Sequence, residues 1–299
     1  MQSSALSQTK STILLTGAST GLGLALSKLL LTTTSYRLVL TARESSLPRF
    51  AEAGIFPQPH VWLRPLDVTD AEQRNRLILE IDEQWGGVDI LINNAGIAYR
   101  SVVEHVGEEE RRAQMDINFL SPMELVRLVL PGMRAKQNGR IINVSSVGGM
   151  MAMPTMAIYS ASKFALEGAT EALWYEVRPW NVRVSLIEPG FIHSSSFENT
   201  RYTRASQASV QHIDEAYHAH YEYMSAFIAR LMSWTVTTPE RVAQKILATI
   251  RHKHPQLRVQ ATFDAHVFSF LRRVLPCRLY HQILYWSLPH VRRWGPKRP

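Results

Sequence analysis

A glycine-rich turn between a β-rich run and a helical pattern constrains the fold of this chain more than any other feature. Residues 11–16 are rich in aliphatic and β-branched side chains, and residues 22–31 have the apolar spacing of a helix. Between them lie Gly17, Gly21 and Gly23. Glycines here allow a tight turn, let the backbone approach a pyrophosphate and let the helix pack closely on the strand. Because a helix N-terminus also offers free amides and a positive dipole, the stretch predicts a dinucleotide site at the start of an α/β fold.

The rest of the chain alternates strand and helix patterns. Strands are expected at residues 37–41, 61–66, 88–92, 140–145, 181–188 and 256–261, and helices at residues 71–85, 108–134 (interrupted near Ser121-Pro122), 158–178 and 238–250. This alternation predicts a Rossmann-type, doubly wound and mainly parallel seven-stranded sheet with helices on both faces. We expect it to form one domain over residues 1–262.

A segment at residues 195–237 interrupts the alternation and is rich in Tyr, His, Met and Phe. Methionine and aromatic side chains adapt to bulky apolar molecules, so we expect a helical lid over a hydrophobic substrate, with ordinary helix packing as the alternative. His218 and His220 lie in this segment, but neither a carboxylate nor a cysteine completes a recognised ligand spacing. No metal site is therefore predicted.

A tyrosine and a lysine four residues apart indicate proton transfer. In Tyr159-Ser-Ala-Ser-Lys163 the two side chains project from one face of the expected helix, so the ammonium can lie beneath the phenol. A phenol with its ordinary pKa of ~10 is a poor base at neutral pH, and an adjacent positive charge lowers that pKa. The spacing alone is common in helices, and the motifs that accompany it decide its meaning.

Those motifs are spread over most of the chain. They are Thr16-Gly-Ala-Ser-Thr-Gly21-Leu-Gly23, Asn93-Asn-Ala-Gly96, Asn118, Ser146 and Pro189-Gly190. In this order and at these separations the chain resembles the classical short-chain dehydrogenase/reductase family over about residues 10–262. Residues 146–154 and 164–168 resemble its 17β-hydroxysteroid and retinol dehydrogenase branch.

The resemblance implies reversible hydride transfer between a nicotinamide dinucleotide and a carbonyl or secondary alcohol. It implies Tyr159 as general acid and base, Ser146 as hydrogen-bond partner of the same substrate oxygen, and Lys163 as the group that lowers the tyrosine pKa. Asn118 is implied to open its helix, hold a water and connect the lysine to solvent. Ser145 is the neighbouring alternative to Ser146, and the separation of thirteen residues from Tyr159 favours Ser146.

The expected cofactor site draws on several motifs. It consists of Gly17, Ser19, Thr20, Gly21, Leu22, Gly23, Arg43, Asp67, Val68, Asn94, Ala95, Gly96, Tyr159, Lys163, Pro189, Gly190, Ile192 and Ser194. By resemblance, Asp67 with Val68 contacts adenine, and Ser194 with the Ile192 backbone binds the nicotinamide carboxamide. The second strand ends near Thr41 without the acid that usually selects NAD. A guanidinium at Arg43 would pair with a 2′-phosphate, so NADP(H) is expected over NAD(H), with Glu44 as the opposing signal.

Composition bounds the compartment and the class of protein. The single cysteine, Cys277, excludes an intrachain disulfide and suits a reducing compartment. Residues 1–10 are polar and contain no apolar signal segment, so a cytoplasmic protein is expected. A hydrophobic content of 45 % with 19 % charged residues is typical of a globular enzyme rather than of a disordered chain.

Residues 263–299 form a basic, aromatic-rich C-terminal extension. Residues 251–299 contain ten lysines and arginines against one acid, Asp264, so their charge exceeds the net +8 of the whole chain. No uncharged apolar run approaches the ~20 residues that span a bilayer. Three partners stay open for the extension: an anionic membrane surface, the protein's own substrate cleft and a second subunit. Nucleic acid is not expected, because no recognised binding motif accompanies the charge.

The sequence thus predicts an NADP(H)-dependent oxidoreductase for a small hydrophobic alcohol or ketone, such as a steroid, retinoid or lipid-like molecule. One alternative is reduction of 3-oxoacyl thioesters by the same fold. Another is a non-catalytic NADP(H) sensor or scaffold, which usually lacks the tyrosine or the lysine. The resemblance also implies a homodimer formed through the helices at 108–134 and 158–178.

Overall fold

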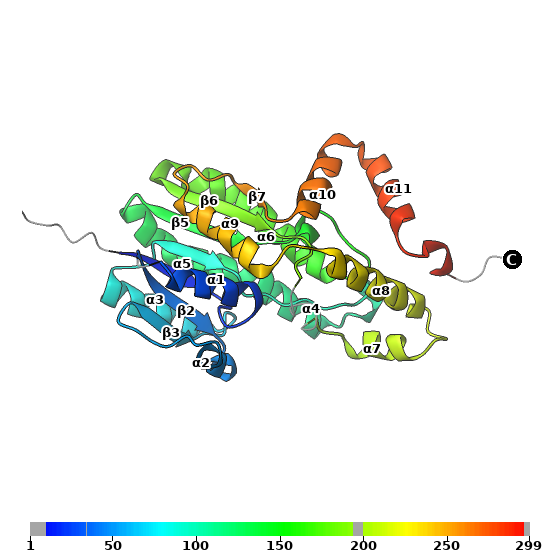
Figure 1. Cartoon of the computed structure of the whole chain (residues 1–299), viewed down its shortest axis with the longest axis horizontal. Helices are drawn as coiled ribbons and strands as arrows, with labels where there is room; N and C mark the ends of the chain where they lie inside the picture. Colours follow the sequence, from blue (N-terminus) through cyan, green and yellow to red (C-terminus); the bar gives the residue numbers. More distant parts are fainter. Residues whose placement is uncertain (1–9, 34, 194–199, 296–299) are drawn as a thin grey trace, which may run out of the picture.

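The computed structural model in Figure 1 describes residues 10–33, 35–193 and 200–295. Its centre is a seven-stranded sheet in the order β3-β2-β1-β4-β5-β6-β7, and each described strand pairs in parallel with its neighbours. The strands are β1 Ser11–Leu15, β2 Tyr36–Ala42, β3 Val61–Pro65, β4 Ile90–Asn93, β5 Gly139–Val144, β6 Val182–Glu188 and β7 Arg258–Gln260. The predicted doubly wound sheet is confirmed, and the order reverses between β1 and β4, where such folds bind ligands.

Helices cover both faces of this sheet (Figure 1). They are α1 Gly21–Leu31, α2 Pro48–Glu52, α3 Ala71–Trp85, α4 Glu108–Met115, α5 Ser121–Ala135, α6 Ala157–Val177, α7 Arg204–Gln211, α8 His218–Trp234, α9 Pro239–Arg251, α10 Phe263–Val274 and α11 Cys277–Ser287. Short 3-10 turns lie at Glu44–Ser46, Val103–His105, Val147–Gly149, Arg178–Trp180 and Val291–Arg293.

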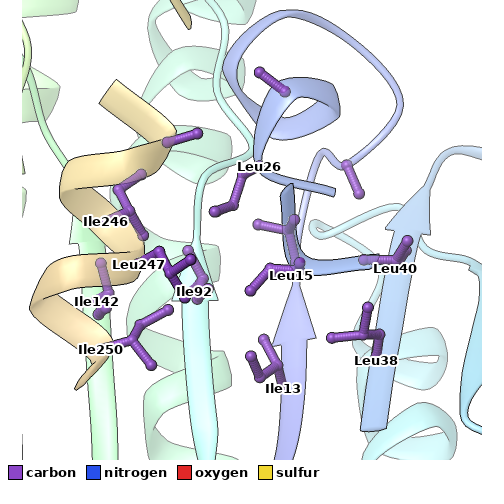
Figure 2. Packing of buried hydrophobic residues seen from close by; sticks show 14 of the residues in the cluster. Ile13, Leu15, Leu26, Leu38, Leu40, Ile92, Ile142, Ile246, Leu247 and Ile250 are labelled. Atoms are coloured by element: carbon purple, nitrogen blue, oxygen red, sulfur yellow. The ribbon is translucent and has the colours of Figure 1, made fainter. Parts of the chain in front are cut away.

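Two hydrophobic cores form because successive strand residues point to opposite faces. Ile13 and Leu15 of β1 belong to the core under α1 and α9, whereas Leu14 belongs to the core under α3, α5 and α6. Figure 2 shows α9 contributing Ile246 and Ile250 to the first core. The strands between the two edge strands β3 and β7 are thus buried on both sides, and the ends of the strands are left to form a site.

The helix predicted at residues 108–134 is interrupted at Asn118, where the resemblance implies an opening, and not at Ser121-Pro122. A π-helical turn at Asp116–Leu120 joins α4 to α5, while Ser121 and Pro122 begin α5 without a break. Pro122 has no N–H to give to the carbonyl of Asn118 four residues before it, so one α-helical hydrogen bond is missing directly after this turn.

The segment after β6 and the C-terminal extension lie together at one end of the molecule (Figure 1). Within the described part of residues 195–237, α7 and α8 form two helices, as the predicted lid requires. The extension folds as α10 and α11, and its Trp294 ring lies 4.6 Å from the His220 ring of α8. Among the helices that the structure describes, none is long and apolar enough to cross a bilayer.

Candidate active site

A cleft of about 670 Å³ opens where the carboxyl ends of the parallel strands meet. All the predicted cofactor residues that the structure describes line it: Gly17, Ser19, Thr20, Gly21, Leu22, Gly23, Arg43, Asp67, Val68, Asn94, Ala95, Gly96, Tyr159, Lys163, Pro189, Gly190 and Ile192. Ser194 lies outside the described residues. Ser146 lines the same cleft, and Asn118 does not. The motifs therefore meet in one place, although they are far apart in the sequence.

The glycine turn is held against the end of β4. Gly17 has a φ of +64°, and a Cβ on it would lie 2.9 Å from the Cα of Ala95. A Cβ on Gly23 would overlap the Gly17 carbonyl. The Asn94 side chain donates to the carbonyls of Thr16 and Gly17 at 3.0 and 3.1 Å. With the turn locked in this way, the N-terminus of α1 faces the cleft and can bind phosphates.

Two arginines lie where the second strand ends. Arg43 is exposed and lines the cleft together with Ser46 and Arg49. Within the described part of the chain, Arg43 makes no ion pair with Glu44, so the predicted opposing signal does not neutralise it. Sequence reasoning missed Arg49, because it enters the cleft wall only after the short helix α2 has folded back. The pair offers two guanidinium groups to an anion.

Ser146, Tyr159 and Lys163 converge on one side of the cleft. Ser146 follows β5, and its Oγ accepts a hydrogen bond of 3.1 Å from Gly148 N and lies close enough to Tyr159 to lower the pKa of the phenol. Lys163, one turn after Tyr159 on α6, is 6 % exposed, and its Nζ lies 5.9 Å from the centroid of the tyrosine ring. The same Nζ donates to the Val144 carbonyl at 2.9 Å. A hydroxyl, a phenol and an ammonium thus lie beside one open space.

Burial disfavours the charged forms of both Tyr159 and Lys163, so it moves their pKa values in opposite directions. It lowers the pKa of Lys163 to about 8, against a smaller opposing effect of the Glu167 charge. It raises the pKa of Tyr159, with the Ser146 hydrogen bond acting in the other direction. The predicted lowering of the tyrosine pKa by the lysine is therefore wrong for the protein by itself. The reason is that desolvation of the phenolate is the largest effect on Tyr159, while the Nζ of Lys163 donates to the Val144 carbonyl.

Asn118 lies behind the cleft and not in its wall. It is 1 % exposed, and its side chain makes paired hydrogen bonds of 2.9 Å with the N–H and carbonyl of Ile97, in the loop after β4. Its Nδ2 also donates to Ser162 Oγ at 3.0 Å, and that hydroxyl donates to the Tyr159 carbonyl at 2.7 Å. Asn118 therefore connects the π-helical turn with the helix that carries Tyr159.

Ser145 points into a charged network and not to the tyrosine. Its Oγ donates to Glu167 at 2.6 Å, and Glu167 pairs with Arg258 of β7 at 2.6 Å. Arg258 also pairs with Glu188 at 2.6 Å and with Glu171 at 3.0 Å. Burial and the charge of Glu167 raise the pKa of Glu188, while Arg258 opposes them. This geometry favours Ser146 over Ser145 at the reacting end.

Sequence reasoning missed this network. Its one sequence signal was the spacing of Glu167 and Glu171, which continue the face of α6 that begins with Lys163. Arg258 joins the two glutamates only because β7 pairs with β6. Glu188 of the network directly precedes Pro189, so the network anchors the start of the loop that lines the cleft.

Thr262, the last residue before the extension, and Asp264 of the extension hold that same loop. Thr262 Oγ1 accepts from Gly190 N, and Asp264 Oδ2 accepts from Phe191 N, both at 2.9 Å. A Cβ on Gly190 would overlap the Asp264 carboxylate. The extension therefore contributes to the shape of the cleft, which is one of the three partners that the sequence left open for it.

The far end of the cleft is mostly apolar, with two arginines. Met153, Met156, Phe191, Ile228 and Met232 line it, together with Arg100 and Arg201. Arg100 is 2 % exposed and donates to Ser225 of α8 at 3.2 Å. The aromatic residue Tyr221, by contrast, is fully buried and accepts from Val102 N at 3.0 Å. The segment predicted as a lid therefore packs as helices and also contributes the side chains of Ile228 and Met232 to the cleft.

Comparisons with known proteins agree with this geometry. A sequence profile described as short chain dehydrogenase matches residues 11–205. A 3-ketodihydrosphingosine reductase of Bacteroides thetaiotaomicron is 35 % identical over 202 residues, covering 68 % of this chain and 71 % of the relative. The 17-beta-hydroxysteroid dehydrogenase type 1 of Homo sapiens is 30 % identical over 260 residues, covering 85 % of this chain and 78 % of the relative.

A solved structure of a short-chain dehydrogenase from Streptomyces avermitilis is similar with a TM-score of 0.76 at 27 % identity, covering 93 % of this chain and 97 % of that one. Other structures with this fold are complexes with NADP or with NAD. The sequence match covers well over half of the chain and includes the glycine turn, Ser146, Tyr159 and Lys163. The chain therefore belongs to the short-chain dehydrogenase family and is an oxidoreductase of that family.

Proposed function

We propose that this oxidoreductase uses NADP(H) to interconvert a carbonyl and a secondary alcohol on a small hydrophobic substrate. The observation that carries the proposal is the meeting of Ser146, Tyr159 and Lys163 in the cleft that the glycine turn also lines. The cofactor fits these residues, because the cleft combines a helix N-terminus for phosphates with arginines for a further anion. When bound, the nicotinamide supplies or accepts the hydride.

The side chains of the protein manage the proton and the charge on the substrate oxygen. Tyr159 donates its proton to the oxygen of the carbonyl as negative charge develops there, and Ser146 hydrogen-bonds the same oxygen. Burial keeps the phenol protonated at neutral pH, which is the form that a reduction requires. We assign Lys163 to proton supply and to the cofactor ribose, following the resemblance to the family. We assign Asn118 to the same proton supply, because it contacts α6 through Ser162.

Replacement of Tyr159 by phenylalanine tests the catalytic assignment. Removing the proton donor should lower kcat by about 10²- to 10⁴-fold and leave NADPH binding within a factor of about two. Tyr175→Phe is the matched control, because Tyr175 lies on the same helix and is 63 % exposed. Unchanged turnover in Tyr159→Phe would refute the catalytic assignment, whereas NADPH binding without turnover in the wild type would favour a sensor or scaffold.

The preference for NADP(H) rests on Arg43 and Arg49 at the end of β2. Arg43→Asp removes a partner of the 2′-phosphate and adds a repelling charge, so the ratio of kcat/KM for NADPH to that for NADH should fall at least tenfold. Arg76→Asp, at an exposed position on α3, is the control. A wild-type enzyme that already prefers NADH would contradict the proposal.

A hydrophobic substrate is supported by the methionine-rich end of the cleft and by relatives named for a sphingoid base and a steroid. Turnover should be measured with steroid, retinoid and long-chain ketones beside a small polar ketone. Activity on the polar ketone alone would refute the proposal, and a strong preference for 3-oxoacyl thioesters would select the alternative reductase.

We also propose a cytoplasmic homodimer that associates through α4, α5 and α6, following the resemblance to the family. Residues 1–262 would form the cofactor-binding domain, and residues 263–299 would form an extension docked on it. Sedimentation equilibrium of the full chain tests the dimer. A monomer at micromolar concentration would contradict it.

A further inference from the structure

The extension exposes an apolar stripe along α10. Phe263, Val267, Phe270 and Val274 follow one another at helical spacing and lie on one face of the helix. They are 81, 38, 63 and 58 % exposed. The other side of α10 is occupied, because Phe268 and Leu271 pack in the cluster around Met150 and Met151. The outward stripe is therefore apolar surface left over after the extension has docked.

The next helix repeats this arrangement. Leu279, Ile283 and Trp286 share one face of α11 and are 44, 45 and 61 % exposed. On the inward face, Tyr280 is 5 % exposed and Leu284 packs in the same cluster as Met150 and Met151. Both helices are thus two-sided. One side holds them on the enzyme, and the other is free to bind something apolar.

Positive charge accompanies the two stripes. Arg273 and Arg278 are exposed at the end of α10 and the start of α11, and the Arg292 guanidinium lies 5.5 Å from the Trp286 ring. The single acid of residues 263–295, Asp264, accepts a hydrogen bond from Phe191 and belongs to the cleft loop. The surface therefore combines apolar side chains with arginines and contains no exposed carboxylate to offset them.

This combination selects among the possible partners. A second copy of the same surface would bring arginines against arginines without an acid to pair with them, which is unfavourable. A nucleic acid would pair with the arginines but would leave the stripes of both helices in contact with polar phosphates. An anionic bilayer satisfies both requirements, because acyl chains accept the apolar side chains and lipid phosphates accept the guanidinium groups.

We propose that α10 and α11 form a docking surface for the face of an anionic lipid bilayer, with both helices in the interface. The docked enzyme would present the methionine-rich end of its cleft close to the lipid, since the inward side of the same helices packs in one cluster with Met153, which lines the cleft. The proposal holds whether or not the catalytic assignment is correct, because no residue of the cleft takes part.

The single cysteine offers a direct probe. Cys277 is exposed at the first residue of α11, between the two stripes. The full-length protein, labelled there with a polarity-sensitive fluorophore, should show blue-shifted emission with vesicles of phosphatidylcholine and phosphatidylglycerol. Partition into these vesicles should be at least tenfold stronger than into phosphatidylcholine alone and should weaken with salt. Sedimentation of unlabelled protein with the same vesicles checks that the label itself does not cause binding.

Three variants complete the experiment. Phe270→Asp should weaken partition more than tenfold, and Arg273→Gln about fivefold. Leu79→Asp is the matched control, since Leu79 is 60 % exposed on α3, and it should leave partition unchanged. NADPH binding and thermal melting of each variant show that it is folded, and they also separate this proposal from the catalytic one.

Equal binding to both kinds of vesicle, no binding at all, or equal effects of Phe270→Asp and Leu79→Asp would overturn the proposal. So would conversion of a dimer to a monomer by Phe270→Asp, because the stripe would then be a subunit interface.

Discussion

The ammonium group of Lys163 is buried, and replacing this lysine by methionine should change stability and activity in opposite directions. Methionine has a similar length and no charge, so it can occupy the same space. We expect Lys163→Met to be inactive, because the proposed proton supply is removed. We expect it also to be more stable than the wild type at neutral pH, because the cost of burying a charge is removed with it.

The magnitude follows from the pKa of this lysine. Burial lowers it from 10.5 to about 8, and one pKa unit corresponds to ~1.4 kcal/mol. Keeping Lys163 charged at pH 7 therefore costs the folded state about 3 kcal/mol. Loss of the hydrogen bond to the Val144 carbonyl offsets about 1 kcal/mol of the gain. The variant should be more stable by about 2 kcal/mol.

The pH dependence has a definite sign. Because the folded-state pKa is the lower one, the folded protein releases this proton first, and the cost is complete below pH 8 and disappears as the pH rises toward 10.5. The stability advantage of Lys163→Met should therefore shrink between these two pH values. Urea unfolding at pH 7 and pH 10 measures it, with Lys28→Met at an exposed position of α1 as control. A variant less stable than wild type at pH 7, or an advantage that does not change with pH, would refute the reasoning.

Three further substitutions test other parts of the site. Arg258→Met should cost about 3–5 kcal/mol of folding stability, because Glu188 is fully buried and loses its cation. Burial raises the pKa of Glu188, so the folded state binds its proton more tightly and the loss of stability should shrink as the pH falls. An equal loss in urea unfolding at pH 5 and pH 8 would contradict this. Gly190→Ala should cost about 1–3 kcal/mol of folding stability and weaken NADPH binding, because the new Cβ displaces Asp264. Asp264→Ala in the same chain should recover part of the loss. Strict additivity of the two substitutions in a double-mutant cycle would argue against the contact between position 190 and Asp264. Asn118→Leu should destabilise by about 2–3 kcal/mol in urea, because it leaves buried backbone groups unpaired, and a loss below ~0.5 kcal/mol would show that these hydrogen bonds are dispensable.

Local patterns were sufficient to predict the fold and most of the cleft wall. The glycine turn identifies the first strand and helix, and the alternation of strand and helix patterns predicts a parallel sheet. In such a sheet every strand ends at the same edge, so motifs that follow different strands must meet there. This rule brought Gly17, Asn94, Ser146 and Pro189 together before any coordinates were known.

Contacts between distant segments could not be predicted in the same way. The sequence pattern placed the interruption of this helix near Ser121-Pro122, whereas the π-helical turn lies at Asn118, where only the resemblance implied an opening. Arg258 reaches Glu167 and Glu188 only through the pairing of β7 with β6, and Asp264 reaches Phe191 only because α10 follows that strand. Periodicity reports which face of an element is apolar, and it does not report which polar group of another element lies opposite.

The sequence by itself determined the sheet, the turn that can bind a dinucleotide, and the identity of the serine, tyrosine and lysine at its edge. The tertiary structure decided their environment: how deeply the tyrosine and lysine are buried, which way each pKa moves, and how Asp264 of the extension supports the cleft loop. The physical reason is that residue type and spacing are properties of the chain, whereas desolvation and charge pairing depend on every group that folding brings within a few ångströms.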